Sequence, residues 1–302
     1  MNKSVLIIDD EQTQVESLNK ALSKMLQDVN FIPVHAEDMI LSAIENKFYS
    51  LAIVDLRMDK YKFDGIELIQ KIILINPFAK IIVISAFKQE YMDKLKTFML
   101  AGKIVDVIEK EEFNKWVAKI VNTINQYYQS ESEDTSPLKS ALLQHYADAK
   151  NEQDISKKGK LFESFVSLLF GNIGYKDVKR RVIDKSRNEV DLIVRNEIDD
   201  LFLNKLGDYF LIECKNNPEE NVGKNDFIQF YSKLDHTNGL ARYGFLFTSG
   251  YIAKSTYIEA VRTSNKSQKI VFYSNSEIER LIKADDIKIE FKNIIDEQVK
   301  DN

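Results

Sequence analysis

The sequence contains a single cysteine, Cys214, among its 302 residues. One cysteine excludes an internal disulfide and any zinc site built from several cysteines. No apolar run approaches the roughly 18 residues that a bilayer-spanning helix needs. The opening MNKSVLIIDDEQ has only four consecutive aliphatic residues before two acids, which is not the pattern of a signal peptide. We therefore expect a cytoplasmic protein.

Histidine and proline are also scarce, with three and four residues. Neither His145 nor His236 has a partner at metal-binding spacing, so neither is favoured as a catalytic group. One proline lies in QSESEDTSPLKS, a polar, acidic, serine-rich stretch that is the best domain boundary in the chain. The length favours two domains. We predict a first domain over residues 1–127, a linker and spacer helix over 128–156, and a second domain over 157–302.

Short apolar segments alternate with amphipathic ones across the first domain. Five segments have the pattern of strands: SVLIID, FIPVHA, SLAIVD, AKIIVISA and KIVDVIE. Helical patterns such as QTQVESLNKALSKML and GIELIQKIILI lie between them. This alternation predicts an α/β domain with a doubly wound, five-stranded parallel sheet that helices cover on both faces.

Polar side chains follow these predicted strands at their carboxyl ends, where parallel α/β sheets bind ligands. Asp9 and Asp10 follow the first strand, Asp55 and Ser85 end the third and fourth, and Lys110 follows the fifth. Clustered acids repel one another, and Mg²⁺, which prefers carboxylate oxygens, would relieve that repulsion. A carboxylate beside Mg²⁺ and a lysine can attack a phosphoryl donor. A hydroxyl and an ammonium can then bind the new phosphate.

With these five residues in the segments IIDD, VDLRM, ISA and IEK, the first domain resembles the receiver domain of response regulators, which has a flavodoxin-like fold. The resemblance implies that Asp55 is the phosphoacceptor and that Asp9, Asp10 and Asp55 bind Mg²⁺. It implies that Ser85 and Lys110 sense the phosphate. It also implies a sensor histidine kinase or a small phosphoryl donor as the partner.

The first domain departs from the usual receiver pattern at several positions. The loop before Asp64 is about two residues longer than usual, and Asp59 and Glu111 stand where proline is common. Val107 occupies the position of the usual aromatic switch residue. These changes leave the residues of the phosphorylation chemistry in place. They remove residues through which receiver domains usually transmit phosphorylation to their last helix and strand.

The second domain places a glutamate and a lysine two residues apart at the end of an apolar run, YFLIECK. Side chains alternate along a strand, so Glu213 and Lys215 share a face. They could be a local ion pair. If NEVDLIV pairs antiparallel with this segment, however, Asp191 also lies close to Glu213. Two carboxylates could then hold Mg²⁺, and the lysine could stabilise the charge that develops when a phosphodiester is cut.

Five polar side chains follow one another on successive elements: Glu163 in a helix, Asp191 in a strand, Glu213 and Lys215 in the next strand, and Gln229 in the following helix. This series resembles the PD-(D/E)xK nucleases of the restriction-endonuclease-like superfamily, and most closely the Mrr-like enzymes. The resemblance implies an α/β fold with a mixed sheet. It implies Asp191 and Glu213 as metal ligands with the Cys214 carbonyl, Glu163 as support of the metal site, and Gln229 beside the catalytic lysine.

The segment KDVKRRVIDKSR carries six basic residues against two acids. It is either a solvated loop or a patch that neutralises phosphates in a nucleic-acid-binding protein. On the second interpretation, the DNA-binding residues are Lys176, Lys179, Arg180, Arg181, Lys185 and Arg187.

Together, the two resemblances imply a response regulator whose output is Mg²⁺-dependent hydrolysis of DNA, with Mn²⁺ as an alternative metal. A second interpretation is a catalytically silent nuclease fold that acts as a phospho-switched DNA- or protein-binding module. A helix-turn-helix regulator is disfavoured because strands follow the linker. We also predict a homodimer, since a symmetric pair would supply two active sites for two strands.

Overall fold

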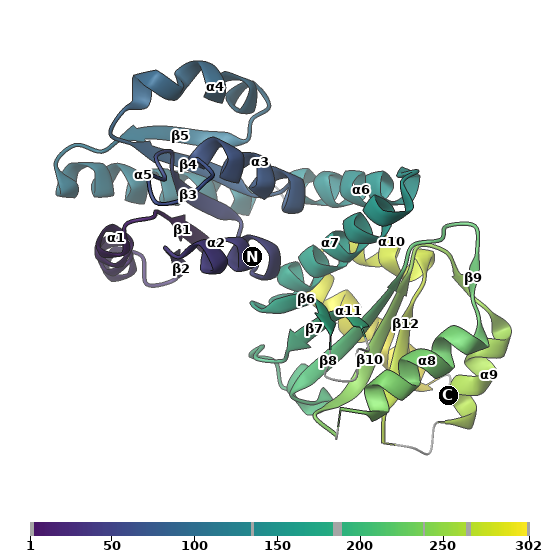
Figure 1. Cartoon of the computed structure of the whole chain (residues 1–302). Helices are drawn as coiled ribbons and strands as arrows, with labels where there is room; N and C mark the ends of the chain where they lie inside the picture. Colours follow the sequence, from purple (N-terminus) through teal and green to yellow (C-terminus); the bar gives the residue numbers. More distant parts are fainter. Residues whose placement is uncertain (1–2, 134–135, 184–188, 238, 264–266, 301–302) are drawn as a thin grey trace. The chain divides into compact units, whose positions relative to one another are not determined.

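The computed structural model describes residues 3–133, 136–183, 189–237, 239–263 and 267–300 (Figure 1). The chain divides into two compact units, Met1–Pro137 and Leu138–Asn302. None of the helices among the described residues combines the length and the apolarity needed to cross a membrane.

The first unit is a parallel sheet with helices on both faces. Its strands are β1 (Ser4–Ile8), β2 (Asn30–Val34), β3 (Leu51–Asp55), β4 (Lys80–Ser85) and β5 (Ile104–Glu109). Its helices are α1 (Gln12–Met25), α2 (Glu37–Asn46), α3 (Gly65–Ile75), α4 (Lys88–Leu100) and α5 (Phe113–Glu133). The strand order is β2-β1-β3-β4-β5, and every neighbouring pair is parallel. The predicted doubly wound parallel sheet is confirmed.

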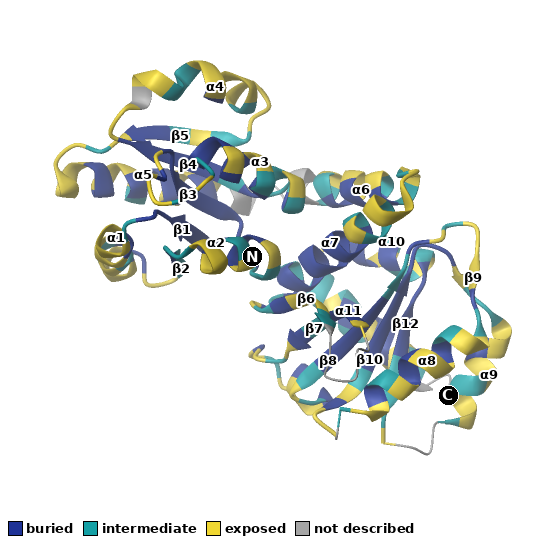
Figure 2. Ribbon diagram, viewed as in Figure 1, coloured by how far each residue is buried: buried dark blue, intermediate teal, exposed yellow. Residues whose placement is uncertain are grey.

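The three central strands of the first unit, β1, β3 and β4, are buried along almost their whole length, as Figure 2 shows. Val5 and Ile7 of β1 pack into one hydrophobic cluster with Trp116 of α5. Leu6 of β1 packs into the opposite cluster with Ile69 of α3. Alternate side chains of one strand therefore anchor it to both helix layers, which holds the carboxyl ends of β1 and β3 side by side.

Gly65 lets α3 begin directly against the end of β3. A Cβ at this position would lie 2.2 Å from the carbonyl oxygen of Asp55, a distance that no side chain can adopt. Asp64, just before it, caps α3 by accepting a hydrogen bond of 3.0 Å from the N–H of Glu67. The Asp64–Gly65 pair therefore helps to position Asp55.

The second unit contains a mixed five-stranded sheet. Its principal strands are β6 (Val178–Ile183), β7 (Glu189–Arg195), β8 (Tyr209–Lys215), β10 (Ala241–Thr248) and β12 (Lys269–Tyr273). The short strands β9 (Asn221–Val222) and β11 (Tyr251–Ile252) pair separately. Its helices are α6 (Ser136–Asn151), α7 (Ile155–Ile173), η1 (Leu203–Leu206), α8 (Lys224–Asp235), α9 (Lys254–Arg262), α10 (Asn275–Lys283) and α11 (Ile287–Lys300).

The order of the principal strands is β12-β10-β8-β7-β6. Strands β12, β10 and β8 are parallel, whereas β7 pairs antiparallel with both β8 and β6. The mixed sheet expected for this half of the chain, and the antiparallel pairing of β7 with β8, are therefore confirmed.

Different helices cover the two faces of this sheet (Figure 1). On one face, Phe170 of α7 and Phe291 of α11 contact Phe245 of β10, with ring centroids 5.9 and 5.2 Å apart. On the other face, Phe230 of α8 packs in a cluster with Leu211 of β8. Glu213 and Lys215 share the face of Leu211, so they lie on the α8 side.

The basic segment of the second unit is not simply a loop. Residues 178–183 form β6, an edge strand antiparallel to β7. Charged side chains are common on edge strands, where one side faces solvent. The interpretation as a solvated loop is therefore wrong for residues 178–183.

Helix α6 lies within the stretch predicted as linker and spacer. It contributes buried side chains to the second unit, among them Leu142 and Tyr146. The Tyr146 ring stacks on Phe165 of α7 with centroids 4.9 Å apart. In the structure, this helix is thus packed on the second unit.

Candidate functional site

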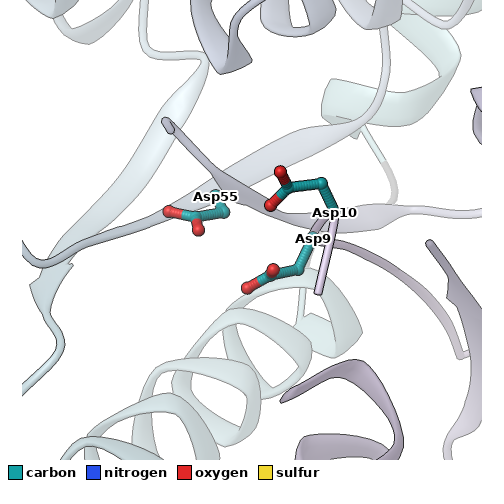
Figure 3. Close-up of side chains that lie close together, drawn as sticks. All are labelled: Asp9, Asp10 and Asp55. Atoms are coloured by element: carbon teal, nitrogen blue, oxygen red, sulfur yellow. The ribbon is translucent and has the colours of Figure 1, made fainter. Parts of the chain in front are cut away.

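Three aspartates meet at the carboxyl edge of the first unit's sheet (Figure 3). Asp9 and Asp10 follow β1, and Asp55 ends β3. All three are buried, and one carboxylate oxygen from each lies within 4.8 Å of the others. Three converging carboxylates are the donor set that a hard divalent cation such as Mg²⁺ prefers.

Lys110 reaches into this cluster from the end of β5. Its Nζ lies 2.8 Å from Asp9 Oδ2 and 2.8 Å from Asp55 Oδ2. Burial raises the pKa of Asp55 to about 6, against the lowering effect of the Lys110 ammonium. Burial also works to lower the pKa of Lys110, but Asp55 and Asp9 outweigh it and raise that pKa. The lysine thus partly neutralises the cluster.

Ser85 and a loop residue complete the surroundings of the three aspartates. Ser85 is buried, and its Oγ accepts a hydrogen bond of 3.0 Å from the N–H of Phe87. In the long loop after β3, the N–H of Lys60 donates to Asp10 Oδ2 at 3.0 Å, and its Nζ lies 2.7 Å from Glu11. The sequence analysis noted the unusual length of this loop but did not identify Lys60 as a neighbour of the aspartates.

In the second unit, the register of β7 and β8 brings two acids together. Leu192 pairs with Ile212, so Asp191 and Glu213 occupy the next positions across the two strands. Asp191 Oδ2 accepts a hydrogen bond of 2.7 Å from the N–H of Cys214. Burial, followed by the charge of Glu213, raises the pKa of Asp191 to about 7. Two carboxylates that disfavour each other's charge in this way suit a bound cation.

Two lysines hold Glu213. Lys215 Nζ lies 3.0 Å from Glu213 Oε1, and Lys233 Nζ of α8 lies 2.8 Å from Oε2. Lys215 is also 3.8 Å from Asp226. The structure therefore brings Asp191, Glu213 and Lys215 together and adds Lys233, which the sequence analysis missed.

The helix spacing of α8 could have indicated Lys233. Residues three and four apart share a helix face, which places Gln229 on one face with Asp226 and Lys233. Gln229 is exposed, one turn away from each of them. It thus shares a helix face with Lys233, one turn away.

Glu163, the expected support of a metal site, is paired with Arg181, an expected DNA contact. The guanidinium binds the carboxylate through two hydrogen bonds, Nε to Oε2 at 2.9 Å and Nη2 to Oε1 at 3.0 Å. Arg181 lies across from Asp191 in the β6–β7 register and has a φ of 50°, a left-handed conformation that is rare outside glycine. The left-handed backbone at Arg181 thus occurs at the residue of the edge strand β6 whose side chain binds Glu163 of α7.

Three of the other five basic residues of this segment lie in the described part of the chain. Lys176 and Lys179 are exposed, and Arg180 is half-buried. Lys185 and Arg187 lie outside the described residues.

We predict that Asp191→Asn stabilises the second unit at pH 8 but has little effect at pH 4. The folded pKa of about 7 exceeds the ordinary 3.8, so folding favours the protonated acid. That contribution is complete below pH 4 and is lost as the pH rises through 7. One pKa unit corresponds to about 1.4 kcal/mol, so we expect a gain of roughly 1–3 kcal/mol at pH 8.

Urea unfolding in a chelating buffer measures this difference. Asp235→Asn, which changes an exposed acid of α8, is the matched control and should have no effect at either pH. An equal effect of Asp191→Asn at pH 4 and pH 8 would contradict the assignment.

Comparisons with known proteins match both halves of the chain. Residues 5–121 match the family model of the response regulator receiver domain, and residues 156–282 match the restriction endonuclease family Mrr_cat. A search of curated proteins found no match.

Several similar solved structures are receiver domains or response regulators. A CheY-like receiver domain protein from Methanospirillum hungatei is 21% identical, with 43% of this chain and 99% of that chain covered and a TM-score of 0.35. A Francisella receiver domain is 18% identical over 43% and 98% of the two chains, with a TM-score of 0.35. The response regulator TrrA from Thermotoga maritima, in complex with Mg²⁺-BeF, is 21% identical over 40% and 98%, with a TM-score of 0.34.

Proposed function

The chain joins a response regulator receiver domain to a restriction endonuclease domain of the Mrr_cat family, and we propose that it is a phosphorylation-controlled nuclease. Its substrate is DNA, and its cofactor is Mg²⁺, with Mn²⁺ as an alternative. The phosphoryl group comes from a sensor histidine kinase or a small donor. The predicted domain bounds, 1–127 and 157–302, remain part of this proposal.

The observation that carries the nuclease proposal is the meeting of two acids and two lysines at one end of the β7–β8 pair. Asp191 and Glu213 are adjacent across the strands, and Lys215 and Lys233 flank Glu213 at 3.0 and 2.8 Å. Both lysines bind Glu213, and neither forms an ion pair with Asp191 among the described contacts. Burial and the charge of Glu213 raise the pKa of Asp191 to about 7, although Lys233 acts to lower it, which supports a site that holds further positive charge.

The residues present fit a magnesium ion. Asp191 and Glu213 would hold it, together with the Cys214 carbonyl that the family resemblance implies, and Glu213 would release one of its lysines. Bound there, Mg²⁺ supplies polarisation of the phosphate and a more acidic water. Lys215 is placed to stabilise negative charge on the phosphate or to help deprotonate the water.

The remaining predicted residues would support the metal site or bind DNA. Glu163 binds Arg181. This hydrogen bond, followed by the charges of Glu163, Glu189 and Asp191, raises the pKa of Arg181. Gln229 lies one turn from Lys233 on α8. We propose that the basic side chains of residues 176–187 contact DNA phosphates.

In the receiver domain, an oxygen of Asp55 attacks the phosphorus of the donor, and the donor's leaving group departs. The attack requires the ionised carboxylate; burial raises the pKa of Asp55 to about 6 in the metal-free site, and a bound Mg²⁺ would favour the ionised form. Lys110 and Ser85 are placed to bind oxygens of the resulting acyl phosphate. Lys110 must then exchange part of its contact with Asp9 and Asp55 for the phosphate.

A cleavage assay tests the proposal. The purified full chain is incubated with supercoiled and single-stranded DNA, with and without Mg²⁺ and acetyl phosphate. We expect metal-dependent cleavage whose rate depends on the phosphoryl donor. DNA binding without cleavage in any divalent metal would instead support the binding-module alternative.

We further predict a homodimer, because two strand cuts need two active sites and closed two-fold pairs are the commonest homo-oligomers. Light scattering with and without acetyl phosphate measures the mass. A monomer in both states at micromolar concentration would refute this prediction.

A further inference from the structure

A pocket of about 560 Å³ opens on the α8 side of the second unit's sheet. Its floor is formed by β6, β7 and β8, and its wall by the end of α8 and the residues that follow. The apolar side chains that line it include Val190, Ile193, Tyr209, Leu211 and Leu240. Its volume lies in the range of small-molecule sites.

The charged groups of the pocket are mainly basic. Lys179, Arg195 and Lys233 line it against one acid, Asp177. Lys233 is also the residue whose ammonium binds Glu213 at 2.8 Å. The pocket therefore adjoins the candidate cleavage site, and the two share a cation.

This combination restricts what the pocket can hold. An apolar floor favours an uncharged, planar group, and Tyr209 offers an aromatic surface. Arg195 pairs with Glu197 at 2.9 Å, so it is Lys179 and Lys233, the latter shared with Glu213, that favour a phosphate attached to that group. A nucleotide has both features, with a base that stacks and a phosphate that pairs.

We propose that this pocket receives one unstacked base of the nucleic acid whose backbone lies at Asp191, Glu213 and Lys215. The inference rests on the proposed function, because it takes the cleavage site as the place of the backbone. The phosphate next to the base lies by Lys233, while the base itself contacts Tyr209 and Ile193.

The pocket has a consequence for the class of substrate. A base inside an intact duplex must be unpaired and unstacked before it can enter, which costs a few kcal/mol. Single-stranded DNA, or a duplex with an unpaired nucleotide, does not incur that cost. The protein therefore prefers such DNA to a fully paired duplex of the same sequence.

Binding in a chelating buffer, where no cleavage occurs, tests the pocket directly. A single-stranded oligonucleotide that contains 2-aminopurine reports both affinity, by anisotropy, and stacking of the base, by its own fluorescence. We expect Tyr209→Ala and the pocket-filling Ile193→Trp to weaken single-strand binding about tenfold and to abolish the fluorescence change. Tyr251→Ala, which removes a tyrosine that is 61% exposed on β11 outside the pocket, is the control and should match the wild type.

The possible outcomes test the base-binding proposal separately from the nuclease proposal. If the wild type cleaves DNA but folded Tyr209→Ala and Ile193→Trp bind and report as the wild type does, the pocket inference is overturned and the proposed function stands. If the variants lose binding while the wild type never cleaves, the pocket stands and the nuclease proposal falls. If deoxyadenosine monophosphate binds in the pocket but strand binding is insensitive to both variants, the pocket takes free nucleotides and the inference is overturned.

Discussion

Replacing Asp191 or Glu213 with alanine should reduce DNA cleavage by orders of magnitude. Each change removes one of two carboxylates that would hold Mg²⁺. Metal activation contributes several kcal/mol to transition-state stabilisation, and each 1.36 kcal/mol corresponds to about tenfold in rate. The rate constant of cleavage under single-turnover conditions measures the loss.

The two substitutions should differ in their effect on stability. Asp191 is disfavoured as an anion, mainly by burial and then by Glu213, so Asp191→Ala should keep or raise the melting temperature in chelator. Glu213 binds both Lys215 and Lys233, and its removal leaves two ammonium groups facing each other. For this position, Glu213→Gln is the better variant, since it keeps the side-chain volume and an oxygen that can accept from one lysine.

The second unit also offers a matched control for these substitutions. Asp235→Ala removes an exposed acid from α8 and should cleave like the wild type. If Glu213→Gln unfolds the second unit, Glu213 belongs to a structural ion-pair network. If folded Asp191→Ala still cleaves at the wild-type rate, Asp191 is not a metal ligand.

The sequence predicted the sheets well because hydrophobic periodicity is local. β1, β3 and β4 are short apolar runs between amphipathic segments, and such runs can hardly be anything but buried strands. β6 was harder, because VKRRVI places three basic residues in a row and resembles a solvated segment. Its strand character depends on pairing with β7, which lies further along the chain.

In the candidate sites, too, the sequence predicted what depends on strand order and missed contacts that depend on how distant elements pack. Asp55 ends β3 and Lys110 follows β5, so the parallel topology of the first unit brings this pair together. Separately, the antiparallel register of β7 and β8 brings Asp191 to Glu213 in the second unit. The pairing of Glu163 with Arg181 could not be predicted, because it joins α7 to an edge strand through one residue with a φ of 50°. Lys233 was missed for a related reason, since only the packing of α8 on β8 brings it to Glu213.

The receiver domain gives the second prediction of large effect, which is that Asp55→Asn abolishes the phospho-adduct. Lys110 Nζ lies 2.8 Å from both Asp55 and Asp9, and of the three clustered acids Asp55 is the one that is itself the last residue of a strand. An amide oxygen is a poor nucleophile, and asparagine carries no charge for the metal site. Intact-mass spectrometry after incubation with acetyl phosphate and Mg²⁺ should show one added phosphoryl group on the wild type and none on the variant.

The expected pH dependence makes this test specific to the geometry of Asp55. Burial raises the pKa of Asp55 to about 6 in the metal-free site, and a bound Mg²⁺ favours the carboxylate and lowers that pKa, so the rate of adduct formation should depend more steeply on the Mg²⁺ concentration at pH 6 than at pH 8. Asp59→Asn is the matched control, since Asp59 is an exposed acid of the neighbouring loop that pairs with Arg57 at 2.9 Å. That variant should acquire the phosphoryl group at the wild-type rate. A phospho-adduct at wild-type level on Asp55→Asn protein would mean that another acid accepts the phosphoryl group, and the assignment of the receiver site would fall with it.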